Sequence, residues 1–312
     1  MYIYEYKKTA VNYKKIYESD EYDTYMFPVN YEVEFPENKN VYLHVFEPTT
    51  EEFKGDIIFL HGIGNNNIPY LEWYGKFLQK KGYRTTFTII PYHLKRTPPG
   101  YKGGELFYSA EPNKCVVRFH KAIKDVRRTI DFLEAFPKYN KSKLFLIGVS
   151  FGGIIGTMVM ALDKRIKKGT LMITGGNWRW INFHSTYTGM VREEYATKGN
   201  SYGCRSEEYC ITHFRSDPVK FCRENFKTIN DIFEKSPIPC YHYDPLSYAK
   251  FVDQKILFIR GRFDKIIPKE ATNDLLELLP NKKVKFIPTG HKTSIIFKRQ
   301  MGIWILKHLE GD

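Results

Sequence analysis

LFLIGVSFGG (residues 144–153) contains an apolar run, a serine, and glycines on both sides of that serine. The apolar run predicts a buried strand, and the sequence IIGTMVMAL that begins at Ile154 predicts a helix. Gly148, Ser150 and Gly152 match the pattern G-x-S-x-G, which between a strand and a helix builds a sharp turn that exposes the serine side chain. The stretch therefore predicts a strand–turn–helix unit, and it leaves open whether Ser150 is a nucleophile or only a polar turn residue.

The chain on both sides repeats this alternation of apolar runs and helical patterns. Runs that are apolar throughout, rather than alternating, are typical of strands buried on both faces of a parallel sheet. The predicted fold class is therefore α/β, with a mostly parallel, doubly wound sheet. The further strand candidates are residues 56–62, 83–92, 169–174, 255–261 and 283–290, and the helical candidates are residues 71–82, 116–136, 271–280 and 295–310.

The start of the chain follows a different pattern. Residues 30–36 and 41–48 alternate between apolar and polar side chains and are separated by PENKN, so they predict a β-hairpin. Residues 1–29 are rich in tyrosine and lysine with little periodicity, and we expect them to form an extension that packs on the core.

The predicted sheet is interrupted once. Residues 177–250 contain many aromatic side chains but no strong candidate for a buried strand. An unstructured connection of that length is uncommon in a compact domain. We therefore expect a largely helical insertion after the sixth predicted strand, flanked by two parts of one α/β core at residues 30–176 and 251–312.

The chain of 312 residues has a formal net charge of +13, which admits two interpretations. A basic surface attracts nucleic acid, anionic lipid or acidic substrates, or it is simply a solvated surface. The basic residues are scattered along the sequence, and no nucleic-acid-binding motif is present. We therefore expect no nucleic-acid partner.

The sequence also lacks the apolar segment of a membrane span, and its start lacks the core of a signal peptide, so we expect a cytoplasmic protein without membrane insertion. Five cysteines in a long cytoplasmic chain are expected to be free thiols. Their clustering near His213 and His242 raises a zinc site as an alternative, but no Cys-x-x-Cys pair supports it, so no metal is predicted. The cysteines are Cys115, Cys204, Cys210, Cys222 and Cys240.

A serine hydroxyl is a poor nucleophile and needs a base, which in turn needs an acid to orient it. His291 follows the last strand candidate and Asp264 follows the one before it. Because the carboxyl ends of parallel strands meet at one edge of a sheet, both side chains should lie near Ser150. The three residues therefore predict a catalytic triad.

A tetrahedral intermediate also needs hydrogen-bond donors that are already in place. The sequence LHGIGNNN follows the first central strand candidate, and its turn can aim the backbone N–H of Ile63 at the site. The backbone N–H of Phe151, just after Ser150, supplies a second donor. Ile63 and Phe151 are the predicted oxyanion-hole residues, whereas we expect His61 to bond neighbouring loops.

The motifs HGIG, GVSFGG, GRFDKIIP and GHKTS resemble those of the α/β-hydrolase superfamily, over the chain from about residue 31 to its end. The order Ser150, Asp264, His291 is the order found in that superfamily. The resemblance implies an eight-stranded sheet, a serine hydrolase triad and a cap domain formed by the insertion. Serine at the nucleophile position disfavours the aspartate-based chemistry of haloalkane dehalogenases and epoxide hydrolases.

These features predict a serine hydrolase that cleaves carboxylic esters through an acyl-enzyme intermediate and needs no cofactor. The aromatic insertion favours a small-molecule ester with an apolar acyl or aryl group. A lipase or lysophospholipase, and a serine peptidase or amide hydrolase, would use the same triad. A binding protein with an idle triad is the alternative from another class. The sequence predicts no oligomeric state.

Overall fold

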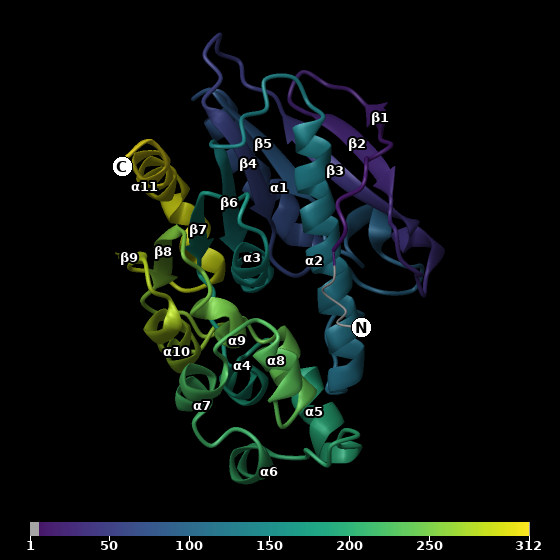
Figure 1. The fold of residues 1–312 in the computed structure, drawn as a ribbon, viewed down its shortest axis with the longest axis vertical. Helices are drawn as coiled ribbons and strands as arrows, with labels where there is room; N and C mark the ends of the chain where they lie inside the picture. The colour runs from purple at the N-terminus through teal and green to yellow at the C-terminus, as the bar shows by residue number, and fades with distance from the viewer. Residues whose placement is uncertain (1–5, 312) are drawn as a thin grey trace.

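A single mixed β-sheet organises the molecule, and the computed structural model describes residues 6–311 of it (Figure 1). Across these residues the sheet has nine strands in the order β1-β2-β3-β5-β4-β6-β7-β8-β9. The strands are β1 (Lys14–Tyr17), β2 (Asp23–Pro28), β3 (Asn40–Phe46), β4 (Gly55–Leu60), β5 (Tyr83–Thr88), β6 (Leu144–Val149), β7 (Lys168–Met172), β8 (Lys255–Gly261) and β9 (Lys282–Ile287).

The six strands from β4 onward pair in parallel, and the three before them pair antiparallel. Every residue of β4, β5 and β6 is buried, as expected for central strands covered on both faces. The structure thus confirms the predicted mostly parallel sheet. It has nine strands where the resemblance implied eight.

The N-terminal part of the sheet differs from the prediction. The strand β2 pairs with β3, whereas residues 30–36, predicted as one arm of the hairpin, form no strand. The reason is packing: Tyr25 and Phe27 of β2 are buried against Phe132, while Glu32 and Glu34 of the predicted arm are exposed. Within residues 1–29, predicted as an extension packing on the core, residues 14–17 and 23–28 form the outermost two strands on one side of the sheet, and residues 1–5 lie outside the described part.

Helices cover both faces of the sheet (Figure 1). Successive side chains of a strand point to opposite faces, so Ile57 and Phe59 join one core cluster while Ile58 and Leu60 join the other. The first cluster packs under helices α1 (Ile68–Gln79) and α11 (Lys298–Glu310), and the second packs under α2 (Pro112–Glu134) and α3 (Phe151–Leu162). The prediction of a doubly wound α/β fold is therefore confirmed.

The chain between β7 and β8 is helical and lies beside the first turns of α2, at the lower end of Figure 1. It follows the seventh strand of this sheet but the sixth predicted one, because β1 and β2 were not predicted and the predicted strand at residues 30–36 does not form. Its helices are α4 (Trp178–His184), α5 (Gly189–Thr197), α6 (Glu207–His213), α7 (Pro218–Asn225), α8 (Asp231–Glu234) and α9 (Pro245–Ala249). The helix α10 (Lys269–Leu278) follows β8, and the 3₁₀ turns are η1 (Pro36–Lys39), η2 (Asn65–Asn67), η3 (Leu94–Arg96), η4 (Pro239–Tyr243) and η5 (Lys292–Phe297).

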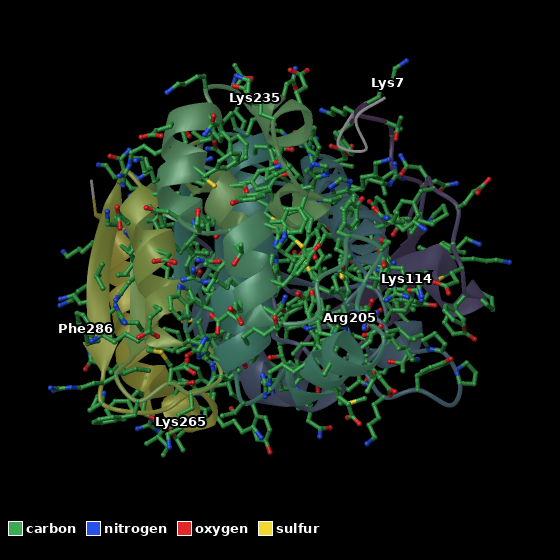
Figure 2. The ribbon with its side chains drawn as sticks, turned by 90° about the horizontal axis from the view of Figure 1, so that it is seen from below. Lys7, Lys114, Arg205, Lys235, Lys265 and Phe286 are labelled. Carbon is green, nitrogen blue, oxygen red and sulfur yellow. The ribbon has the colours of Figure 1, made fainter. Side chains whose placement is uncertain are left out.

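Within residues 6–311 no helix is long and apolar enough to cross a membrane. Side-chain nitrogen and oxygen atoms are intermixed over the face seen in Figure 2, where the labelled basic residues Lys7, Lys114, Arg205, Lys235 and Lys265 lie apart from one another.

Candidate active site

Ser150 occupies a strained turn between β6 and α3. Its backbone φ is 52° and its ψ is −115°, values that a residue with a side chain rarely adopts. The flanking glycines make the turn possible: a Cβ on Gly152 would lie 2.1 Å from the carbonyl oxygen of Leu60, and a Cβ on Gly148 would lie 2.6 Å from that of Gly152. The G-x-S-x-G pattern is thus explained by close backbone contacts.

The turn is fixed by hydrogen bonds from the next strand and the loop after it. The backbone N–H of Ser150 donates to the carbonyl of Met172 at 2.8 Å. The hydroxyl of Thr174 donates to the carbonyl of Ser150 at 2.7 Å. These bonds offset the cost of the strained backbone and hold the serine side chain at the carboxyl edge of the sheet.

The structure brings together the three residues predicted as a triad. The Nε2 atom of His291 lies 2.8 Å from the hydroxyl oxygen of Ser150, and its Nδ1 atom lies 2.8 Å from Oδ2 of Asp264. All three side chains are largely shielded from solvent. The arrangement can pass a proton from the serine hydroxyl to an imidazole whose other nitrogen faces a carboxylate.

Asp264 is itself held in place by the backbone that follows it. Its Oδ1 atom accepts hydrogen bonds from the N–H groups of Ile266 and Ile267, both at 2.9 Å. This leaves Oδ2 directed at His291. Asp264 follows β8 and His291 follows β9, so the parallel pairing of these strands sets the distance between the two residues.

The predicted oxyanion-hole residues, Ile63 and Phe151, line the same cavity as Ser150. Phe151 is the first residue of α3, where backbone N–H groups have no partner within the helix. Ile63 belongs to the loop after β4. The two residues therefore reach the cavity from the ends of the adjacent strands β4 and β6.

The loop that carries Ile63 is fixed by two residues whose roles differ. The Nε2 atom of His61 accepts from the N–H of Ile90 at 3.1 Å, and its Nδ1 lies 2.7 Å from the carbonyl of Gly62. Complete burial lowers the pKa of His61 well below its usual value, so it stays neutral and joins the two loops as expected.

Asn65 provides the second anchor of this loop, and the sequence did not distinguish this role from that of a pocket residue. Its Oδ1 atom accepts from the N–H of Leu94 at 2.6 Å, and its amide donates to the hydroxyl of Thr97 at 3.4 Å. A Cβ on Gly103 would lie 2.0 Å from the same Oδ1, so a later part of the same connection between β5 and α2 also packs on Asn65. The run of asparagines after β4 was the sequence signal for this anchoring role. It could not identify the partners of Asn65, because Leu94 and Thr97 are distant in sequence.

A cavity of about 650 Å³ opens beside Ser150. The helical segment after β7 forms part of its wall, with Trp178 and Ile181 of α4 and Val191 of α5. Sequence reasoning missed the charged residues of the wall. Two of them, Lys114 and Arg118, come from α2, and a helical pattern alone does not show which face of that helix meets the cavity.

All five cysteines are buried and form no disulfide. Burial raises the pKa of the thiols of Cys115, Cys222 and Cys240 to about 12, so they remain protonated. Among residues 6–311 no cluster of three or more histidine, cysteine, aspartate or glutamate side chains could hold a metal ion.

No protein-family model matches the sequence, and no curated protein sequence is significantly similar to it. Solved structures do match the fold. Acetyl xylan esterase 1 from Thermoanaerobacterium sp. JW/SL YS485 has a TM-score of 0.57 at 14% identity, over 96% of this chain and 86% of that one. A cold-adapted esterase from an Arctic intertidal metagenomic library has a TM-score of 0.57 at 16% identity, over 97% of this chain and 100% of that one.

Pyrococcus horikoshii acylaminoacyl peptidase is also similar, with a TM-score of 0.59 at 13% identity, over 94% of this chain and 49% of that longer one. These three enzymes share the α/β-hydrolase architecture. The similarity spans nearly the whole chain and agrees with the parallel sheet and with the strand–turn–helix at Ser150. The chain therefore has the α/β-hydrolase fold.

Proposed function

We propose that this protein is a serine hydrolase that cleaves carboxylic esters, with Ser150 as nucleophile, His291 as general base and acid, and Asp264 as the residue that orients His291. The observation that carries the proposal is the hydrogen-bonded series Ser150–His291–Asp264 at the wall of a cavity of about 650 Å³. A serine side chain held at the end of a strained turn is an uncommon arrangement, and such strain clusters at functional sites.

The proposed reaction has two halves. His291 takes the proton of Ser150 as the serine oxygen attacks the ester carbonyl, and the N–H groups of Ile63 and Phe151 stabilise the resulting oxyanion. His291 then protonates the leaving alcohol, and an acyl-enzyme remains. Water attacks the acyl group with His291 again as base, and the acid leaves. No step requires a metal or an organic cofactor.

The cavity supports a substrate with an apolar part. Aromatic and aliphatic side chains from the loop after β5 and from α3, α4 and α5 line the cavity beside the serine, and such walls bury the apolar part of a ligand. We propose that residues 177–250 act as a cap over the site, because α4 and α5 form part of the cavity wall. Five buried thiols without a disulfide are consistent with a reducing, cytoplasmic environment.

The test is a panel of p-nitrophenyl esters of increasing acyl length, assayed with the wild-type protein and with Ser150→Ala. We expect turnover by the wild type and loss of activity by about 10⁴-fold or more in the variant. Stoichiometric labelling of Ser150 by a fluorophosphonate would report the activated nucleophile independently of the acyl group. Absence of both turnover and labelling would contradict the proposal.

An amide hydrolase is the second candidate, favoured by the structural similarity to an acylaminoacyl peptidase. It would use the same groups, with His291 protonating an amine. Aminoacyl p-nitroanilides assayed beside the esters separate the two functions: a higher kcat/KM on the anilides would favour the peptidase.

A further inference from the structure

Three basic side chains line the cavity beside Ser150: Lys102, Lys114 and Arg118. Arg118 is only 9% exposed, whereas Lys114 is exposed on the face of the molecule shown in Figure 2. Residues four apart on a helix lie on the same side, so Lys114 and Arg118 together form a basic strip of the α2 wall.

Carboxylates of the protein neutralise this strip only weakly. The nearest carboxylate oxygen to Arg118 is Oε2 of Glu34 at 3.8 Å, beyond hydrogen-bonding distance, and Glu34 is 58% exposed. The guanidinium also contacts Tyr92: its centre lies 5.6 Å from the ring centroid, and it hydrogen-bonds to the Tyr92 side chain. Within residues 6–311, no carboxylate lies within 4.0 Å of the ammonium group of Lys114.

The two acidic residues of the cavity wall accept hydrogen bonds from backbone N–H groups and not from the basic strip. Oε2 of Glu194 accepts from the backbone N–H of Ala110 at 3.0 Å, and Oε2 of Glu105 accepts from the backbone N–H of Lys102 at 2.8 Å. Neither carboxylate pairs with Arg118 or Lys114. The Arg118 guanidinium is largely buried and its ion pair with Glu34 is long, so a ligand anion could add charge-assisted hydrogen bonds that Glu34 does not make.

We propose that the substrate of this site is an ester that carries an anionic group, such as a carboxylate, bound by Arg118 and Lys114 while the ester carbonyl lies at Ser150. This inference rests on the proposed function and specifies its substrate class. The planar guanidinium suits the two oxygens of a carboxylate, and the ammonium one turn away adds a second positive charge.

The experiment compares esters that differ only in charge. In the acyl series, p-nitrophenyl half-esters of adipic and suberic acid are paired with their terminal carboxamides, which have the same shape without the charge. In the leaving-group series, 3-carboxy-4-nitrophenyl acetate is paired with its 3-carbamoyl analogue. Ratios of kcat/KM within each pair are measured for the wild type, Arg118→Met, Arg118→Lys and Lys114→Met, with Ser150→Ala as the background.

In the wild type we expect the carboxylate member of at least one pair to be preferred by about tenfold or more, the size of one charged hydrogen bond. The ratio should fall to about one in Arg118→Met, fall partly in Lys114→Met and be largely retained in Arg118→Lys. Lys124→Met, on the same helix but outside the cavity, is the matched control and should leave the ratio and the activity unchanged. Thermal unfolding verifies that each variant is folded.

Wild-type turnover of both members of every pair at equal rates would overturn the inference and leave the proposed ester hydrolysis intact. A preference that survives in folded Arg118→Met would overturn it as well, as would a preference for the carboxamides. Failure to hydrolyse any ester of the panel would overturn the proposed function and this inference together.

Discussion

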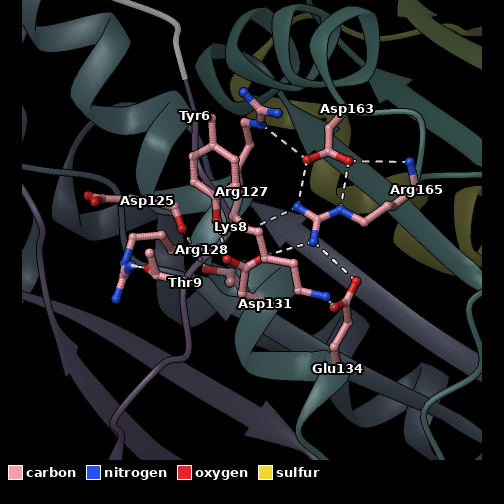
Figure 3. Close-up of polar contacts among 11 residues, drawn as sticks. Tyr6, Lys8, Thr9, Asp125, Arg127, Arg128, Asp131, Glu134, Asp163 and Arg165 are labelled. Carbon is pink, nitrogen blue, oxygen red and sulfur yellow. Dashed lines mark hydrogen bonds and ion pairs between the residues drawn. The ribbon is translucent and has the colours of Figure 1, made fainter.

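The two halves of α2 use their charged residues differently. In the C-terminal half, Arg165 reaches across from the loop before β7 to Asp131 at 2.6 Å, to Glu134 at 3.1 Å and to Asp163 at 2.7 Å (Figure 3). Asp163 also accepts from Arg127 of α2 at 3.1 Å. In the N-terminal half, Lys114 and Arg118 face the cavity with no carboxylate of the described chain closer than 3.8 Å.

The difference separates charges that pair within the fold from charges that line the cavity and that we propose bind a ligand. Asp131 and Asp163 are almost fully buried, and each is matched by basic partners, as a buried carboxylate requires. The cavity wall keeps a largely buried guanidinium whose nearest carboxylate lies at 3.8 Å, and the proposed triad keeps a serine in a strained backbone conformation. The stability of the fold accounts for the paired charges at the C-terminal half of α2. It does not account for the cavity residues Arg118 and Ser150.

The largest effect that would test this comparison is expected at the cavity. Asp264→Asn should lower kcat on p-nitrophenyl butyrate by about 10³–10⁴-fold, because the amide would favour the wrong tautomer of His291. The Asn side-chain oxygen can still accept from Ile266 and Ile267, so the melting temperature should change little. Asp253→Asn, at an exposed ion pair, is the matched control and should retain full activity. A loss in kcat below tenfold for Asp264→Asn would contradict the assignment of the triad.

The next effect is expected in the paired network and concerns stability alone. Arg165→Met leaves two buried carboxylates with fewer partners, so the free energy of unfolding should fall by about 3 kcal/mol. The value of kcat/KM should stay within twofold, because Arg165 does not line the cavity. Urea unfolding and ester kinetics measure the two quantities, and Lys164→Met at the exposed pair with Asp253 should cost less than about 1 kcal/mol. A reduced kcat/KM in folded Arg165→Met would contradict the proposal that Arg165 contributes to stability and not to activity.

The smallest effect concerns His93, a buried neutral group behind the cavity. Burial is the main cause that lowers the pKa of His93 to about 4, from an ordinary value of 6.5. Its Nδ1 lies 2.9 Å from the carbonyl of Pro91, and its Nε2 has no hydrogen-bond partner within the described residues, so a proton there would be unsatisfied. The unfolded chain binds more protons between these two pKa values, so stability should fall as the pH falls through this range.

For His93 the loss amounts to about 2 kcal/mol between pH 7 and pH 5. His93→Gln should remove this share of the pH dependence, even if it lowers stability at neutral pH. Urea unfolding at both pH values, for the wild type and the variant, gives the difference. An unchanged slope in the variant would show that His93 is not buried in its neutral form.

The arrangement of Ser150, His291 and Asp264 was largely predictable because it depends on local chain properties. Gly148 and Gly152 are needed at a turn only five residues long, and the apolar runs before Ser150, Asp264 and His291 identify the strands that carry these residues to one edge. The N-terminal strands were not predictable in the same way. The alternation of residues 30–36 suits a strand, but Tyr25 and Phe27 of β2 bury their rings against α2, and that contact decided the pairing.

By itself, the sequence determined the α/β architecture, the strained turn at Ser150 and the placement of Asp264 and His291 at the ends of later strands, because each depends on periodicity or on contacts between near neighbours. Only the tertiary structure decided which strands form the sheet edge, which face of α2 meets the cavity, and which charges find partners. These features depend on segments that are distant in sequence. Arg165 pairs with carboxylates because the loop before β7 packs on α2, whereas Arg118 lines a cavity. Burial and pairing, which separate the two arginines, come from the fold and not from the residue type.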